Sequence, residues 1–358
     1  MRDLFNFGQM LSAHARMSPD RVGARDLDRA MSFALWNERA CRLANGLLGL
    51  GLAKGDRVAI LAYNCVEWCE IYAATAKAGL VALPINFRLT APEVQFIVEN
   101  AEAAAVIVQD ELTGLVEETR KDLGIADDRF IHFGTKPRPA GYRGYEDIIA
   151  SAADREPGQQ VALSDPWTLM YTSGTTGKPK GVLRSHRSAV LLSMVTEIEL
   201  KLSRNDGALL VMPMCHANSL NFFGAFGYVG GVNSIYSRKS FDPEHAVTTL
   251  ADGSSTFTSL VPTHYIMMLD LPRAVRAQHD FSAVTKLMIS SAPARPETKR
   301  EVMEMFPKSG LYELYGATET GWVTMLHPHE QFTKLGSVGR ECVGAAPIRL
   351  LDEAGNEV

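Results

Sequence analysis

Short runs of apolar residues alternate with longer amphipathic segments along most of the chain. The runs Val58 to Ala62 and Ala104 to Val108 predict buried strands. Between them, Thr90 and Glu93 have the spacing of a capping box, and Pro92 suits the first turn of the helix that would follow. This alternation of strand and helix is typical of an α/β protein.

The same pattern recurs on both sides of one weak region. Asn64 is expected to cap a helix that begins near Glu67 and stops at Gly79. Between Gly134 and Gln160 the periodicity fades into Gly, Pro and polar residues, which predicts a boundary between sub-lobes at about 1–160 and 161–330. Further strands are expected at Val81 to Leu83, Trp167 to Tyr171, Ala208 to Met212, Thr256 to Leu260, Lys286 to Ser290 and Leu311 to Tyr315.

The end of the chain changes character. Ile348 to Val358 is typical of a hairpin, with a strand IRLLD and a turn EAGNE. The fold class expected is therefore α/β, with two doubly wound mixed sheets, flanking helices, and the start of a small antiparallel barrel in 331–358.

Length and composition narrow the class of protein. The chain has 358 residues, more than the roughly 250–300 that one hydrophobic core usually serves, so two or more packed lobes are expected. With 46% hydrophobic and 22% charged residues, the composition is that of a globular protein. The net charge of −5 and the absence of a long basic run argue against nucleic acid or anionic lipid as a partner.

Cysteine and histidine usage adds little chemistry. The five cysteines are scattered, and no secretory signal precedes them, which predicts reduced thiols in a cytoplasmic protein. His327 and His329 resemble a metal pair, but no third ligand is in sight, so a solvated loop is the preferred interpretation. The uncharged stretch Gly207 to Ser237 is broken by Pro, Asn and Gly, and is therefore not expected to span a membrane.

The strongest chemical signal follows the strand at Trp167 to Tyr171. A glycine loop there frees backbone N–H groups to approach an anion, while hydroxyls and lysines add donors and charge. It is not a Walker A motif, because two residues separate its glycines and proline follows the first lysine. The residues expected to bind phosphate are Thr172, Ser173, Gly174, Thr175, Thr176, Gly177, Lys178 and Lys180.

With this loop the sequence resembles the adenylate-forming superfamily of acyl-CoA synthetases, luciferases and peptide-synthetase adenylation domains. The segment YTSGTTGKPKGV resembles the superfamily signature. Further segments resemble the family in the family's order: NFRLTAPEVQFIVENAEA, MPMCHANS, TFTSLVPT, ISSAPARPE, LYGATE and GSVGR. The likeness covers essentially the whole chain.

The resemblance implies roles for individual residues. Thr172 to Gly177 and Lys180 would wrap the ATP phosphates, Thr318 would contact the α-phosphate, and Glu319 would bind Mg²⁺, for which a carboxylate is a suitable ligand. Tyr315, with Gly316 and Ala317, and the loop of Ser291, Ala292 and Pro293 would flank adenine.

Two assignments in the resemblance remain open. His216 would lie beside the substrate carboxylate, although a histidine among apolar residues is as often a core residue. Asn218, Phe222, Phe223 and Gly224 would line an acyl tunnel, but they are equally good core residues.

The resemblance further implies an acid–thiol ligase that uses ATP, Mg²⁺ and CoA on a carboxylic acid. A fatty or aryl acid is expected, because no acidic residue is placed to hold an amino group. Family members continue into a ribose-binding aspartate, a hinge and a small C-terminal domain with a catalytic lysine, all beyond Val358, so this chain is expected to bind ATP but to adenylate poorly. A catalytically silent nucleotide or acyl-CoA binding module is the alternative, and the oligomeric state stays open, a homodimer included.

Overall fold

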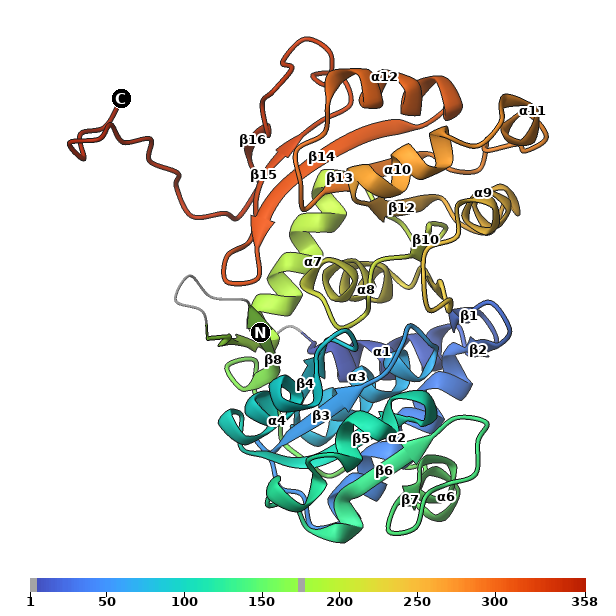
Figure 1. Ribbon diagram of the computed structural model, residues 1–358, viewed down its shortest axis with the longest axis vertical. Coiled ribbons are helices and arrows are strands. Elements are labelled where there is room, and N and C mark those ends of the chain that lie inside the picture. The colour runs from blue at the N-terminus through green and yellow to red at the C-terminus, as the bar shows by residue number, and fades with distance from the viewer. Residues whose placement is uncertain (1–4, 173–177) are drawn as a thin grey trace.

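Two twisted sheets lie one above the other in the computed structural model, which describes residues 5–172 and 178–358 (Figure 1). Within these residues the lower sheet has seven strands in the order β7-β6-β5-β3-β4-β8-β9, and the upper sheet has nine in the order β16-β15-β14-β13-β12-β10-β11-β1-β2. The strands of the lower sheet are β3 (Arg57–Leu61), β4 (Val81–Ile85), β5 (Ala103–Gln109), β6 (Phe130–Phe133), β7 (Arg143–Gly144), β8 (Pro166–Thr172) and β9 (Lys180–Ser185).

The upper sheet is mainly parallel with antiparallel strands at both ends. Its strands are β1 (Val22–Arg25), β2 (Ala30–Ser32), β10 (Gly207–Leu210), β11 (Val232–Ile235), β12 (Phe257–Leu260), β13 (Lys286–Ser290), β14 (Gly310–Ala317), β15 (Gly321–Leu326) and β16 (Arg340–Glu341). The helices are α1 (Phe7–Met17), α2 (Phe33–Gly49), α3 (Glu67–Ala78), α4 (Ala91–Asn100), α5 (Thr113–Glu117), α6 (Tyr145–Ser151), α7 (His186–Leu200), α8 (Ala217–Val229), α9 (Pro243–Ala251), α10 (Pro262–Leu269), α11 (Arg273–Arg276) and α12 (Pro296–Met305). The prediction of an α/β fold with two mixed sheets is confirmed.

The expected division near residue 160 does not follow the sheets. β1 and β2, from the first part of the chain, lie in the upper sheet, where β1 pairs in parallel with β11. β8 and β9, which follow the boundary, lie in the lower sheet beside β4. The physical reason is that each pair extends a sheet edge laid down by strands far away in sequence, which a local fall in periodicity does not reveal.

Helix boundaries show where the local signals hold. The Glu93 carboxylate accepts hydrogen bonds from the backbone N–H and the hydroxyl of Thr90, both at 2.8 Å, as the capping box predicts. Gly79 ends α3 in the left-handed conformation, with φ 68°.

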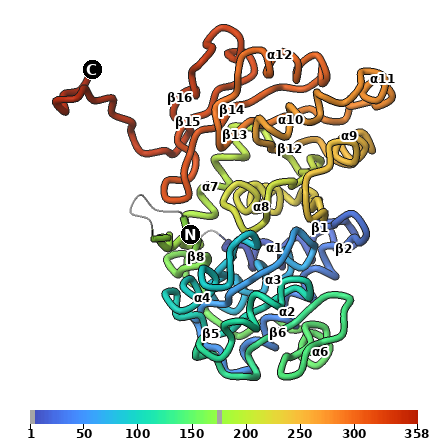
Figure 2. The backbone as a smooth tube through the Cα atoms, viewed as in Figure 1, coloured from blue at the N-terminus to red at the C-terminus, as the bar shows by residue number. Residues whose placement is uncertain are grey.

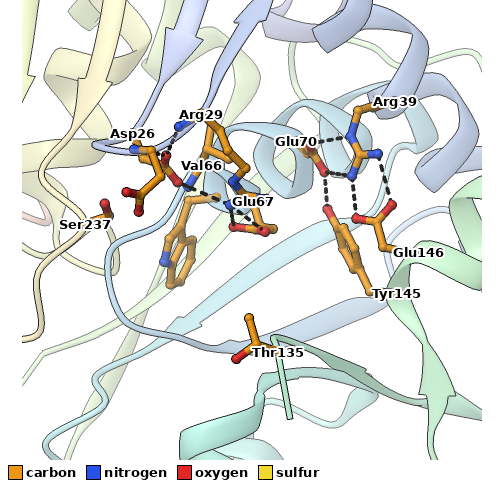
Figure 3. Close-up of polar contacts among 12 residues, drawn as sticks. Asp26, Arg29, Arg39, Val66, Glu67, Glu70, Thr135, Tyr145, Glu146 and Ser237 are labelled. Atoms are coloured by element: carbon orange, nitrogen blue, oxygen red, sulfur yellow. Dashed lines mark hydrogen bonds and ion pairs between the residues drawn. The ribbon is translucent and has the colours of Figure 1, made fainter. Parts of the chain in front are cut away.

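The expected cap at Asn64 is wrong. The Asn64 amide binds the backbone of Val211, Met212 and Met214 instead, which lies directly before α8. Its place before α3 is taken by Asp26, from the turn between β1 and β2, whose carboxylate accepts the N–H of Val66 at 3.2 Å (Figure 3).

Ion pairs to two buried carboxylates fix α3 against its neighbours (Figure 3). Arg39 of α2 donates to Glu70 of α3 at 2.6 Å, and the Tyr145 hydroxyl of α6 donates to the same carboxylate at 2.8 Å. Burial raises the pKa of Glu70, while the Arg39 guanidinium opposes that shift. Near Val66, Arg29 donates to Glu67 at 2.8 Å. These contacts tie the start of α3 both to the lower lobe and to the strand pair of the upper sheet.

Aromatic side chains fill the space between the sheets, where α1, α3 and α8 lie (Figure 1). Phe7 of α1 stacks on Trp167 of β8 with ring centroids 5.3 Å apart, and contacts Phe223 of α8 at 4.8 Å. Phe223 also meets Trp36 and Tyr72. One hydrophobic core therefore includes side chains from both sheets.

The last residues lead away from the body (Figure 2). The expected hairpin in 348–358 is present in short form: an antiparallel bridge joins Leu351 to Glu357 across the predicted turn, but no longer strand forms. All five cysteines are buried and free, as their scatter predicts. Among the described residues no helix is long and apolar enough to cross a membrane.

Candidate active site

The expected phosphate loop joins two paired strands of the lower sheet. β8 ends at Thr172 and β9 begins at Lys180, and these two residues pair in the antiparallel register. Ser173, Gly174, Thr175, Thr176 and Gly177 lie outside the described residues. Lys178 and Lys180 are both exposed to solvent.

Glu319 of the upper lobe meets the first residue of this loop. The Thr172 hydroxyl lies 3.3 Å from Glu319 Oε1, although 147 residues separate the two in sequence. Thr318 and Glu319 stand in the turn between β14 and β15, and a Cβ atom on Gly316 would lie 2.3 Å from the Gly321 carbonyl oxygen. Only glycine fits there, and the tight hairpin carries Glu319 toward the lower lobe.

The expected adenine site lies at the ends of two neighbouring strands. β13 and β14 run parallel with Ser290 paired to Leu314, so Ser291 and Tyr315 follow side by side. Ser291 has φ 68°, a left-handed conformation that is costly for a residue with a side chain. Ser291, Ala292 and Pro293 are exposed, as is the Tyr315 ring at 55%, so a flat ligand has open access to both.

A cavity of about 430 Å³ opens beside this edge. Its lining includes Met212, His216, Asn218, Asn221, Ser290, Ser291, Leu314, Gly316, Ala317, Thr318 and Trp322. His216, the residue before α8, lies at its solvent-accessible side. Loss of solvent around the ring and the nearby Arg88 guanidinium lower the pKa of His216, so the imidazole is neutral at pH 7. The structure thus brings His216 and Thr318 to one cavity.

The expected acyl tunnel along α8 is only partly present. Phe222 and Phe223 are fully buried among other rings, which makes them core residues. Gly224 lets α8 approach α7 closely, because a Cβ there would lie 3.1 Å from the Ser193 hydroxyl. Asn218 does line the cavity.

A second cavity of about 360 Å³ lies on the other side of the β14–β15 turn, against β9 and the start of α7, and shares Thr318 and Trp322 with the first. Arg184, which lines this second cavity, was not predicted from the sequence. Among the described residues its only hydrogen-bond partner is the Met170 sulfur at 3.9 Å, and burial lowers its pKa to about 10. The sequence shows an arginine in the strand after a glycine loop, but not that its side chain is buried beside a cavity.

Asn221, Ser259 and Ser290 were also missed. Single polar residues in apolar segments give no sign of whether they face a cavity, and an asparagine in the middle of a hydrophobic helix was the one visible hint.

The histidine pair has partners of its own. His327 Nε2 lies 2.9 Å from Glu199 Oε2, and the His329 ring stacks on His327 with centroids 6.0 Å apart. The described part of the chain contains no group of three or more His, Cys, Asp or Glu side chains that could hold a metal ion.

Comparison with known proteins identifies the family and the fold. The family described as AMP-binding enzyme matches residues 11–358. The chain belongs to this family of AMP-binding enzymes. Among solved structures, the inhibitor-bound N-terminal domain of FACL13 from Mycobacterium tuberculosis is 27% identical with a TM-score of 0.86, over 99% of this chain and 86% of that one. The anthranilate CoA ligase AuaEII, at 24% identity, shares the fold with a TM-score of 0.92, over 100% of this chain and 68% of that one.

Several relatives within the AMP-binding enzymes are CoA ligases. Indoleacetate–CoA ligase of Aromatoleum aromaticum is 30% identical over 98% of this chain and 67% of its own length. Long-chain-fatty-acid–CoA ligase FadD13 of Mycobacterium tuberculosis is 32% identical over 94% and 65%. Feruloyl-CoA synthase of an Amycolatopsis species is 30% identical over 91% and 62%. The chain therefore spans about two thirds of the curated relatives it matches.

Proposed function

We propose that the chain carries the ATP-binding and acid-binding part of an AMP-forming acid–CoA ligase. In the first step a carboxylate oxygen attacks the α-phosphorus of ATP, and the bond to the β-phosphate oxygen breaks to release pyrophosphate. In the second, the CoA thiolate attacks the acyl carbon and AMP leaves. The observation that carries the proposal is the contact of Thr172 with Glu319, which joins the two motifs expected at the triphosphate.

The residues present suit a magnesium nucleotide. Glu319 offers an exposed carboxylate and Thr172 and Thr318 offer hydroxyls, the hard oxygen donors that Mg²⁺ and phosphate prefer. A bound Mg²⁺ would neutralise charge on the polyphosphate. Lys180 stands opposite Thr172 in the register, so its charge lies at the same end of the strand pair. Glu319 would hold the metal, and Lys180 would attract the departing pyrophosphate.

The acid would enter the 430 Å³ cavity, with its carboxylate between His216 and Thr318. A neutral His216 can donate or accept a hydrogen bond there without holding the carboxylate as a permanent ion pair. The relatives act, by their names, on indoleacetate, long-chain fatty acids and ferulate. An aryl or fatty acid is accordingly the proposed substrate class, and CoA the proposed thiol. The five buried free cysteines suit the cytoplasm, where thiols stay reduced.

Calorimetry with Mg-ATP tests the nucleotide site on this chain. Glu319→Gln and Thr172→Val are each expected to weaken binding about tenfold or more, because each removes a polar contact worth on the order of 1.4 kcal/mol. Glu304→Gln, on the exposed face of α12, is the matched control and should bind as the parent does.

Two results would count against the site. If the parent gives no heat with Mg-ATP, the nucleotide proposal fails; if the two variants bind as tightly as the parent, Thr172 and Glu319 are not its ligands. Turnover is tested separately by hydroxylamine trapping of an acyl hydroxamate, with the longest polypeptide that the gene encodes. Tight ATP binding without any hydroxamate from that polypeptide favours a silent binding module.

A further inference from the structure

The inner end of the 430 Å³ cavity is polar. The Asn218 Nδ2 donates to the Ser290 hydroxyl at 2.7 Å and to the Ser259 hydroxyl at 3.2 Å, and the two hydroxyls lie 3.3 Å apart. This network fixes the amide plane. The amide oxygen of Asn218 is buried and has no partner among the described residues.

Asn221 adds a second amide one turn further along α8. It is 6% exposed and lines the same cavity, and no hydrogen bond joins its side chain to any described residue. Residues three apart lie on one face of a helix, so Asn218 and Asn221 present their amides to the same side. An amide that faces a cavity without a protein partner is available to hydrogen-bond a polar group of a ligand.

The ring of Trp322 forms one wall of the cavity beside these amides. Phe222 is fully buried, with its ring centroid 4.7 Å from that of Phe257 and 5.3 Å from that of Trp322. The Trp322 N–H is already bound to the Thr196 hydroxyl at 2.7 Å, so its ring offers the cavity an apolar face. The cavity therefore has an apolar aromatic wall beside its amides, which suits a flat ring.

The remaining residues of the cavity surround the carboxylate end of the proposed acid. Met212 and Leu314 are apolar, and His216 stands at the start of α8, where the carboxylate is placed in the proposed function. Five residues of helix separate His216 from Asn221, about 7.5 Å along the axis at 1.5 Å per residue. A single aromatic ring with one group at each end fits this span between an acid-binding end and an amide-lined end.

We propose that this cavity selects a compact aromatic carboxylic acid whose ring carries a hydroxyl or amino group opposite the carboxylate. The substituent donates to an asparagine amide oxygen and, where it is a hydroxyl, accepts from an amide N–H. Asn221 and the Asn218–Ser290–Ser259 network are the specificity-determining residues. The inference rests on the proposed function, because it assumes that the acid occupies this cavity.

Binding of acyl-adenylate analogues to the chain tests the inference without turnover. The probes are 5′-O-(N-acylsulfamoyl)adenosines carrying 4-hydroxybenzoyl, 4-methylbenzoyl or dodecanoyl groups. The methyl group matches the hydroxyl in size but cannot form hydrogen bonds. The 4-hydroxybenzoyl analogue is expected to bind at least tenfold more tightly than the 4-methylbenzoyl analogue, and more tightly than the dodecanoyl analogue, whose chain has no group that can hydrogen-bond the amides.

Variants locate the preference. Asn221→Leu should bring the ratio of the two benzoyl affinities close to one, whereas Asn205→Leu, in an exposed turn, should leave it unchanged. Ser290→Ala should reduce the ratio through the Asn218 network. Thermal unfolding checks that each variant is folded. The comparison of the three analogues on the parent chain tests the inference even if a variant is not folded.

The outcomes distinguish a failure of the proposed function from a failure of the proposed aromatic specificity. If none of the analogues binds, the proposed function itself fails. If analogues bind but the hydroxyl and methyl forms are equal, or the dodecanoyl form is the tightest, the proposed function stands and the inference is overturned. If Asn221→Leu still prefers the 4-hydroxybenzoyl analogue as strongly as the parent does, Asn221 does not recognise the ring substituent.

Discussion

His186, the first residue of α7, is an unusual buried histidine. It is fully buried, it stacks on Trp167 with ring centroids 5.8 Å apart, and neither ring nitrogen has a partner among the described residues. Burial lowers its pKa to about 4, with Asp165 opposing the shift and Lys54 adding to it. The imidazole is therefore neutral wherever the protein is folded at ordinary pH.

This depressed pKa makes stability depend on pH. In the unfolded chain His186 takes up a proton near its ordinary pKa of 6.5, whereas the folded chain takes one up only near 4. The unfolded state binds more protons between these values, so the contribution of His186 is complete above about pH 6.5 and is lost as pH falls toward 4. His186→Phe should therefore lose less free energy of unfolding than the parent between pH 7.5 and 5, measured by urea denaturation.

The exposed His329 provides the control for this experiment. His329→Phe should keep the parent's loss of stability between the two pH values. Equal losses in the parent and in His186→Phe would show that His186 does not titrate as its burial implies.

The sequence predicted Thr172, Thr318, Glu319 and His216 as site residues because each belongs to a local motif, and the structure brings Thr172 to Glu319 and brings His216 and Thr318 to one cavity. It did not anticipate Asn221 or Arg184. Whether a lone polar side chain faces a cavity or the core depends on how α8 and β9 rotate against their neighbours, and that rotation is set by tertiary packing.

The residues that cap the helices of this chain lie at very different separations in sequence from the helix they cap. Thr90 and Glu93 cap α4 within four residues, whereas α3 receives Asp26 from a distant turn. The strands expected from apolar runs are present within one or two residues at most positions, because burial on both faces leaves a strong pattern. Long-range capping and pairing leave no such pattern.

The cap of α1 gives a prediction at this scale. The Asn6 side chain accepts from the Gln9 N–H at 3.0 Å, and the Gln9 side chain accepts from the Asn6 N–H at 3.1 Å. Because Asn6 is almost fully buried, Asn6→Ala would leave the Gln9 N–H without its acceptor. The variant should lose about 1 kcal/mol of unfolding free energy in urea denaturation, within the 0.5–2 range of such caps. A loss no larger than that of Asn205→Ala, on the surface, would contradict it.

At the scale of the whole molecule the two sheets share one core. Phe223 of α8 is fully buried against Phe7, Trp36 and Tyr72. Since α1 and α8 pack between the sheets, this side chain stabilises both lobes at once. The division at residue 160 missed this, because apolar periodicity shows which residues are buried but not which partners they meet.

Phe223→Ala should therefore destabilise both sheets together. Truncation of a fully buried phenylalanine typically costs about 3–5 kcal/mol of unfolding free energy. Hydrogen exchange, followed in β5 of the lower sheet and β13 of the upper, should accelerate in both strands. Leu191→Ala, at an exposed position of α7, is the control and should change neither. Acceleration in one sheet alone would show that the lobes unfold independently.

The exchange of strand pairs between the sheets has a consequence for dividing the polypeptide. If the chain were cut near residue 160, the first fragment would carry β1 and β2 of the upper sheet but lack β8 and β9 of the lower sheet. The second fragment would carry β8 and β9 but lack β1 and β2. The first fragment would expose the open edge of β4, and the second that of β11, and unpaired edges recruit other chains. Separately expressed fragments should aggregate, whereas co-expression should let each donate its strand pair and restore a soluble whole.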